Sequence, residues 1–170
     1  MEELKNHEKF EIEVLDRLNS CRLLDKLIFL GGTMLRLCHN LDRYSVDLVF
    51  WIVKEIDISS FFEKIKACLA KHYQIRDAQN KYYSMIFEIG AEKYVRSLKI
   101  EIRKEIKKVK IEKKIAFSQF SDTQVLVNAI TLDEMMDAKI KAFIDRGEIR
   151  DAYDIEFLYK KGIDIKVEKE

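Results

Sequence analysis

FLGGTMLRLCHNLDRYSVDLVFW, residues 29–51, is the stretch of this chain that decides the fold. An apolar run over residues 27–30 ends at Gly31-Gly32-Thr33, and residues 33–39 follow with helical spacing. A second apolar run, residues 46–53, is rich in β-branched and aromatic side chains and carries Asp47. The stretch therefore predicts a strand, a glycine turn, a helix and a strand with one carboxylate, a layout that suits phosphate binding.

The faces of the second strand separate its polar and apolar residues. Side chains alternate along a strand, so Ser45, Asp47, Val49 and Trp51 share one face, and residues 46, 48, 50 and 52 form the core face. A carboxylate is costly to bury unless it is paired or metal-bound. Asp47 is thus either a functional ligand or the partner of a nearby arginine, Arg36 or Arg43.

The remainder of the chain alternates helical and strand patterns. Helices are expected over residues 5–19, 60–72, 131–145 and 150–161, and strands over 81–89, 95–104 and 124–129. Ser59 or Ser60 is the expected cap of the second of these helices, and Thr131 with Glu134 forms a capping-box pattern before the third. This order predicts an α+β fold, a mixed central β-sheet with helices packed on it and two C-terminal helices. We expect one compact unit, with a core over residues 1–130 and a C-terminal helical segment over residues 131–170.

Composition indicates a globular protein and leaves its partners open. Hydrophobic residues make up 48% of the 170 residues and charged residues 36%, at a net charge of +1. The lysine-rich run at residues 103–114 fits either a grip on a nucleic-acid backbone or a solvated hairpin or basic edge. Trp51, Tyr82 and Tyr83 are expected in the core or on a sheet face.

Cysteine spacing and hydropathy bear on the compartment. The three cysteines, Cys21, Cys38 and Cys68, form no Cys-x-x-Cys pair, so we expect small core residues and neither a zinc site nor a disulfide framework. The N-terminus has no apolar segment typical of a signal peptide, and no apolar run approaches the roughly 18 residues of a membrane span. A cytoplasmic protein without a membrane partner is expected.

Two separate motifs resemble one known family. Leu30-Gly-Gly-Thr-x-Leu-Arg36 followed by Arg43-x-Ser-x-Asp-Leu-x-Phe50 is similar to the AbiEii/AbiGii-type toxins of the nucleotidyltransferase superfamily. The run from Ala138 to Asp154, AKIKAFIDRGEIRDAYD, resembles that family's Lys-x-x-Ala helix and Arg-Asp-x-Tyr-Asp element. The resemblance covers residues 27–160 and implies the minimal nucleotidyltransferase fold.

The resemblance also implies a set of site residues. In this family the Gly-Gly-Thr turn holds the nucleotide's triphosphate, and two aspartates spaced Asp-x-Asp bind a divalent metal, with a third carboxylate on a neighbouring strand. Here Asp47 matches the first aspartate, Val49 occupies the place of the second, and Glu101 best matches the third carboxylate. The implied nucleotide-binding residues are Gly31, Gly32, Thr33 and Lys139, the implied catalytic residues are Asp47, Glu101, Lys139 and Asp151, and the implied ligands of Mg²⁺ or Mn²⁺ are Asp47 and Glu101.

Each of these residues also has a structural interpretation. Glu101 lies in a Lys-x-Glu-x-Arg strand that would suit a solvated face, and Lys141 is as plausible a candidate as Lys139 on composition. Asp151 and Asp154 fall in the first turn of a helix, where carboxylates favour the helix dipole without any function.

The resemblance implies transfer of a nucleoside monophosphate from a nucleoside triphosphate to an acceptor, with RNA such as a tRNA end as the acceptor. It also implies a cognate antitoxin protein as a partner. The alternative is a catalytically degraded binding module, because Val49 cannot ligate a metal. Two carboxylates can still hold one Mg²⁺ with help from water and phosphate oxygens.

Overall fold

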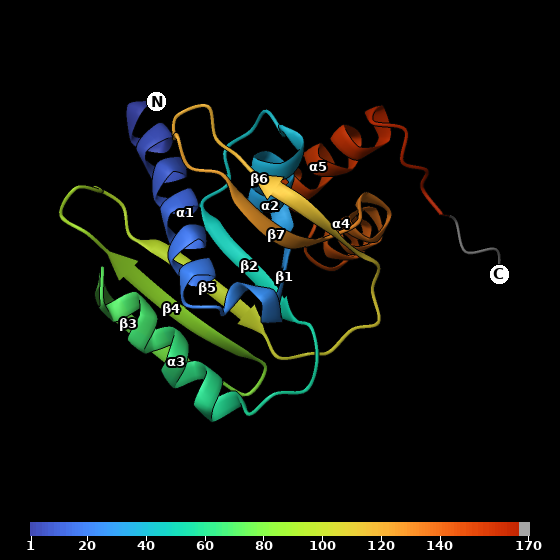
Figure 1. Cartoon of the computed structure of the whole chain (residues 1–170). Coiled ribbons are helices and arrows are strands. Elements are labelled where there is room, and N and C mark those ends of the chain that lie inside the picture. The colour runs from blue at the N-terminus through green and yellow to red at the C-terminus, as the bar shows by residue number, and fades with distance from the viewer. Residues whose placement is uncertain (167–170) are drawn as a thin grey trace.

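A single seven-stranded sheet organises the molecule. The computed structural model describes residues 1–166, and its strands run in the order β3-β4-β5-β2-β1-β7-β6 (Figure 1). β2 pairs with β5 and β1 with β7 in parallel, and the other neighbours are antiparallel, so the sheet is mixed as predicted. The strands are β1 Leu27–Leu30, β2 Asp47–Ile52, β3 Gln74–Asn80, β4 Ser84–Gly90, β5 Leu98–Arg103, β6 Ile111–Ala116 and β7 Val125–Ile130.

Five α-helices and one 3₁₀ turn complete the chain. α1 and α3 contact each other and the sheet, and α4 and α5 pack together on the far side of β1 and β7 in Figure 1. None of the helices within residues 1–166 has the length and apolarity needed to cross a bilayer. The helices are α1 Glu2–Ser20, η1 Leu24–Lys26, α2 Gly31–His39, α3 Ile58–Ala70, α4 Leu132–Arg146 and α5 Ile149–Lys160.

The strand–helix–strand unit predicted from residues 29–51 is confirmed. All four residues of β1 are buried, and α2 begins directly at Gly31, whose φ of +90° is a left-handed conformation that favours glycine. The glycine pair is therefore the first turn of α2 rather than a separate turn before it. Asn40, also left-handed at φ 62°, ends the helix.

The two faces of β2 and β5 differ as the alternation predicts. Leu48, Phe50, Ile100 and Ile102 are fully buried on the face that α1 and α3 cover. The opposite face carries charged side chains from both strands, and these lie around a cavity: Asp47, Lys99, Glu101 and Arg103. The core thus fixes which side of the sheet holds the polar site.

Several local expectations were wrong. β3 was not foreseen, because its sequence QIRDAQN is mostly polar and it lies at the sheet edge. α3 is capped by Asp57, whose carboxylate accepts a bond from the Ser60 amide at 3.0 Å, and neither serine is the cap. Thr131 stands at the start of α4 without a side-chain cap bond, and the capping box is not formed, since Glu134 accepts from the Lys110 amide at 3.1 Å instead.

The cysteine expectation was also wrong. Cys21 at the end of α1 and Cys68 in α3 form a disulfide across a Cα–Cα distance of 6.4 Å, and Cys38 is free. The two are 47 residues apart in sequence, so their spacing gave no sign of the pairing. The bond fastens α3 to α1 on the covered face of the sheet.

The lysine-rich run divides into a connection and an edge strand. Residues 104–110 lead from β5 to β6, which is the last strand of the sheet, so the basic-edge interpretation fits residues 111–114. The Lys107 ammonium lies 4.7 Å from the centre of the buried Trp51 ring. Tyr82 and Tyr83 were expected to be covered, but they are 85% and 80% exposed at the turn between β3 and β4.

Candidate functional site

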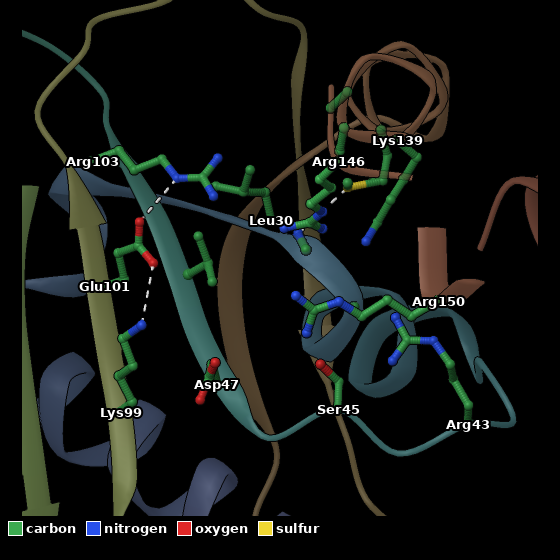
Figure 2. A pocket seen from close by; sticks show the side chains of 16 residues that line it. Leu30, Arg43, Ser45, Asp47, Lys99, Glu101, Arg103, Lys139, Arg146 and Arg150 are labelled. Atoms are coloured by element: carbon green, nitrogen blue, oxygen red, sulfur yellow. Dashed lines mark hydrogen bonds and ion pairs between the residues drawn. The ribbon is translucent and has the colours of Figure 1, made fainter. Parts of the chain in front are cut away.

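A charged cavity of about 280 Å³ lies on the open face of the sheet, where the start of α2, strands β2 and β5, and helix α4 meet (Figure 2). Its lining includes six cationic side chains and only two carboxylates. Such an excess of positive charge favours a ligand with several negative charges, such as a polyphosphate. The charged lining residues are Arg43, Asp47, Lys99, Glu101, Arg103, Lys139, Arg146 and Arg150.

The two carboxylates lie on neighbouring parallel strands. Asp47 is the first residue of β2 and pairs in register with Lys99, and Glu101 on β5 pairs in register with Val49. The Glu101 carboxylate is 3.3 Å from the Arg103 guanidinium and 3.9 Å from the Lys99 ammonium, and Figure 2 shows these three side chains in a row along β5. The sheet therefore brings together the two residues predicted to hold a metal.

Val49 lines the cavity, in register with Glu101 and close to the start of α2. A side chain added at Gly31 would come within 3.7 Å of the Val49 Cβ, so the valine packs against that glycine. Within the described residues no three His, Cys, Asp or Glu side chains gather as a metal site. Asp47 and Glu101 supply hard oxygen donors that suit Mg²⁺ or Mn²⁺, but such an ion would need its other ligands from water or phosphate oxygens.

Gly32 lets the Arg43 and Ser45 side chains lie close to the first turn of α2, where an added side chain would force them to move. An added Cβ would lie 2.7 Å from a terminal nitrogen of Arg43 and 2.9 Å from the Ser45 hydroxyl oxygen. Gly31 donates its amide to the Met135 sulfur at 3.4 Å, which joins the start of α2 to α4. The first turn of a helix leaves backbone N–H groups without helical partners, so this turn is suited to phosphate oxygens.

Thr33 occupies a different place from the one its predicted role suggests. The side chain is buried and does not line the cavity. Its hydroxyl donates to the backbone carbonyl of Asp47 at 2.7 Å, which ties the first turn of α2 to the start of β2. In this geometry Thr33 positions Asp47, and the glycine backbone is the part of the turn that faces the cavity.

Lys139 is the buried cation of the site. It is 6% exposed, whereas Lys141 on the same helix is exposed, so burial separates the two candidates that the sequence left open. The Lys139 ammonium lies 2.7 Å from one oxygen of Asp154 and 3.3 Å from one oxygen of Asp151. Both aspartates are fully buried, so they fix the ammonium where it lines the cavity.

Asp151 holds a second cation at the same wall. Its carboxylate accepts two bonds from Arg146, at 2.7 and 2.8 Å, and Asp151 itself is not among the lining residues. Burial alone would raise the pKa of Asp151, but the Arg146 hydrogen bonds and the Lys139 charge hold that pKa below its usual value. The carboxylate therefore stays ionised and orients Lys139 and Arg146.

Arg43 has a role in the site that sequence analysis did not predict. Its guanidinium makes a two-point bond to Asp154, and it does not pair with Asp47 as one alternative supposed. Arg36, the other suggested partner of Asp47, is bonded to Glu8 instead. No local pattern marks Arg43 as a partner of Asp154, because the two are 111 residues apart. Figure 2 shows Arg146 and Arg150 on the same side of the cavity as Lys139, and neither was singled out as a lining residue.

Comparisons with known proteins identify a family and a fold. Residues 13–169 match the model of the family described as nucleotidyl transferase AbiEii toxin, type IV toxin–antitoxin system. The crystal structure of JHP933 from Helicobacter pylori superposes with a TM-score of 0.64 at 21% identity, over 94% of this chain and 67% of that one. A candidate nucleotidyltransferase of H. pylori gives the same score and identity over 69% of its length. These likenesses establish a shared fold. No protein with a curated description matches the sequence.

Proposed function

This chain belongs to the AbiEii family of nucleotidyltransferase toxins of type IV toxin–antitoxin systems, and on that basis we propose that it transfers a nucleoside monophosphate from a nucleoside triphosphate to an acceptor. The family identified from the two sequence motifs is confirmed. The nucleotide, the metal and the acceptor belong to the proposal.

The observation that carries the proposal is the arrangement of charge around the cavity. Lys139, Arg146 and Arg150 lie on one side, the first turn of α2 lies beside them, and Asp47 and Glu101 lie on the strands opposite (Figure 2). A triphosphate would place its oxygens against the cations and the helix start. The two carboxylates would then lie beside the α-phosphate, where the reaction takes place.

The proposed reaction is an attack by an acceptor hydroxyl oxygen on the α-phosphorus. A new phosphorus–oxygen bond forms, the bond to the β-phosphate breaks, and pyrophosphate leaves while the hydroxyl proton passes to a basic oxygen. Lys139 and Arg146 neutralise the charge that grows on the leaving pyrophosphate. Asp47 and Glu101 would hold one Mg²⁺ or Mn²⁺, which when bound neutralises charge on the phosphate oxygens.

The proposal also covers the acceptor and the cellular compartment. We take RNA, such as a tRNA end, as the acceptor, and the cytoplasm as the compartment. A type IV family implies a cognate antitoxin as a partner.

A labelled-nucleotide assay tests the proposal. The full chain is incubated with each of the four labelled triphosphates, total RNA and Mg²⁺ or Mn²⁺, and label on RNA is measured. Transfer should be seen with the wild type and lost with Asp47→Ala and Lys139→Ala. Lys141→Ala is the matched control on the same helix, and because that side chain is exposed it should keep full transfer. Loss of transfer in this control as well would contradict the roles assigned here.

The second candidate function is a nucleotide-binding module without transfer activity, and Val49 is the observation that favours it. The valine faces Glu101 where a second metal aspartate would lie, so only two carboxylates remain. Binding of triphosphates without label on RNA, unchanged when Val49→Asp is introduced, would support this candidate over the enzyme.

A further inference from the structure

The turn between β3 and β4 presents two uncovered aromatic rings. Tyr82 is 85% exposed and Tyr83 80%, and their ring centres lie 4.7 Å apart at an interplanar angle of 83°. Adjacent large aromatic side chains exposed to this degree indicate a binding surface rather than a packing role. Nothing in the core requires aromatic residues at these two positions.

Backbone hydrogen bonds hold this turn in place. The Lys81 amide donates to the Ser84 carbonyl at 2.8 Å, and the Lys104 amide donates to the Tyr83 carbonyl at 2.9 Å. The Lys104 ammonium also donates to the Lys81 carbonyl. The two rings therefore stand on a fixed base, which lowers the entropy lost when a ligand orders them.

Two lysines lie beside the two tyrosines. Lys81 precedes them in the turn, and the Lys104 ammonium is bonded to the Lys81 carbonyl. Lys107 and Lys108 follow in the connection to β6, where Lys107 lies over the Trp51 ring and pairs with Glu105. Figure 1 shows this connection leaving the end of β5 and crossing toward β6. We name the surface formed by Lys81, Tyr82, Tyr83 and Lys104 the tyrosine platform.

The tyrosine platform lies beside the end of β5, the strand whose Glu101 and Arg103 line the cavity. Arg103 lines the cavity, pairs with Glu101 and lies in register with Ser84, the residue after the two tyrosines. Glu101 and Lys104 are three residues apart along the strand direction, which corresponds to about 10 Å. A chain bound at the carboxylates would reach the tyrosines within a few nucleotides.

We propose that the tyrosine platform binds a single-stranded segment of the acceptor RNA, with unpaired bases stacked on Tyr82 and Tyr83 and backbone phosphates on Arg103 and Lys104. This inference rests on the proposed function, because it supplies the acceptor to the same cavity. Aromatic rings stack on bases of any sequence, and lysines neutralise phosphates, so the combination is typical of binding to unpaired strands. The excess of positive charge favours a polyanion over a protein partner.

The test measures RNA binding separately from nucleotide binding. A fluorescein-labelled single-stranded RNA of mixed sequence is titrated by fluorescence anisotropy with the wild type and with the Tyr82→Ala/Tyr83→Ala double variant. The double variant should bind about tenfold or more weakly, because one stacked base contributes about 1–3 kcal/mol. The Tyr82→Phe/Tyr83→Phe variant should bind like the wild type, since its rings still stack. Tyr159→Ala is the matched control, because Tyr159 is 62% exposed on α5.

Three results would overturn the inference: no binding of the single strand by the wild type, equal binding by the double alanine variant, or tighter binding of the duplex of the same sequence. Triphosphate binding, measured by calorimetry, separates a failure of the tyrosine platform from a failure of the proposed function. A wild type that binds triphosphate but not RNA refutes the tyrosine platform alone, whereas a wild type that binds no triphosphate refutes the proposed function.

Discussion

Arg43 and Asp154 stand 111 residues apart in the chain and meet in a two-point ion pair, at 2.7 Å from Nε and 2.5 Å from the second nitrogen. Asp154 is fully buried and also accepts from Lys139. A single carboxylate on α5 thus fixes one cation from the loop before β2 and one from α4. The C-terminal helices are joined to the strand–helix–strand unit through this aspartate, and two walls of the cavity depend on it.

Asp154→Asn should therefore lower both stability and triphosphate affinity. Removing one partner leaves Lys139 without its nearest counter-charge in a buried position, and such changes cost about 3–5 kcal/mol. Urea unfolding at neutral pH measures the loss. The control is Glu156→Gln on the same helix, whose pair with Lys160 is exposed on both sides and should contribute less than about 1 kcal/mol. An Asp154→Asn protein as stable as this control would contradict the assigned role.

Val49→Asp should create stronger binding of a divalent ion. The new carboxylate would join Asp47 on the same face of β2 and Glu101 opposite it, so three donors would converge. Without metal the three negative charges should repel and lower the melting temperature, and Mn²⁺ should reverse that loss. Thermal unfolding with and without Mn²⁺ measures both effects.

Val49→Asn is the matched control for the aspartate variant, because it has a similar shape without the charge. The asparagine variant should show little response to Mn²⁺. An equal response of the two variants would mean that the ion binds elsewhere.

The sequence predicted the relationships between residues that are close together in the chain and missed those between residues that are far apart. The alternation of β2 places Asp47 and Val49 on one face, and the family motif points to Lys139, which is buried in the structure. Relationships across long separations, such as Arg43 with Asp154 and Cys21 with Cys68, have no period or spacing that a sequence reveals. They depend on how the sheet and helices pack.

Local patterns also failed where tertiary structure redirected a group. Thr33 has the residue type expected of a phosphate ligand, but the neighbouring strand start lies close enough for its hydroxyl to bond the Asp47 carbonyl. Glu134 fits a capping box, but the connection after β5 brings the Lys110 amide to it. Tyr82 and Tyr83 are of a residue type that is common in strands, yet they lie in the turn between β3 and β4.

Gly32→Ala should weaken triphosphate binding more than it lowers stability. The added methyl group would meet the Arg43 guanidinium at 2.7 Å, and Arg43 is held by Asp154, so the guanidinium must move away from the cavity. We expect triphosphate affinity to fall about tenfold, as for the loss of one charge-assisted hydrogen bond. Calorimetric titration measures it, with circular dichroism to confirm that the variant is folded. Unchanged affinity would show that Arg43 does not contribute to the bound state.

A buried carboxyl group lies away from the cavity, on α1. Glu11 is fully buried, and neither side-chain oxygen has a hydrogen-bond partner within residues 1–166. The Nε2 atom of His7 lies 3.6 Å from one of these oxygens. Burial raises the pKa of Glu11 well above its usual value, and the adjacent Glu8 adds to this effect. Burial lowers the pKa of His7, so the two groups favour their neutral forms.

Glu11→Gln should stabilise the protein at neutral pH. A carboxyl group whose pKa is raised in the folded state contributes its full stability below the unfolded pKa, about 4.3, and loses it as the pH rises toward the folded value. The glutamine has no proton to lose, so its advantage should be small at pH 4.5 and should rise to about 1 kcal/mol or more at pH 7.5, or about 2–4 °C in melting temperature. Urea unfolding at the two pH values measures the difference. The control is Glu8→Gln, which breaks the buried pair with Arg36 and should destabilise the protein at pH 7.5. A Glu11→Gln protein that is less stable than the wild type at pH 7.5 would mean that Glu11 is ionised in the native state.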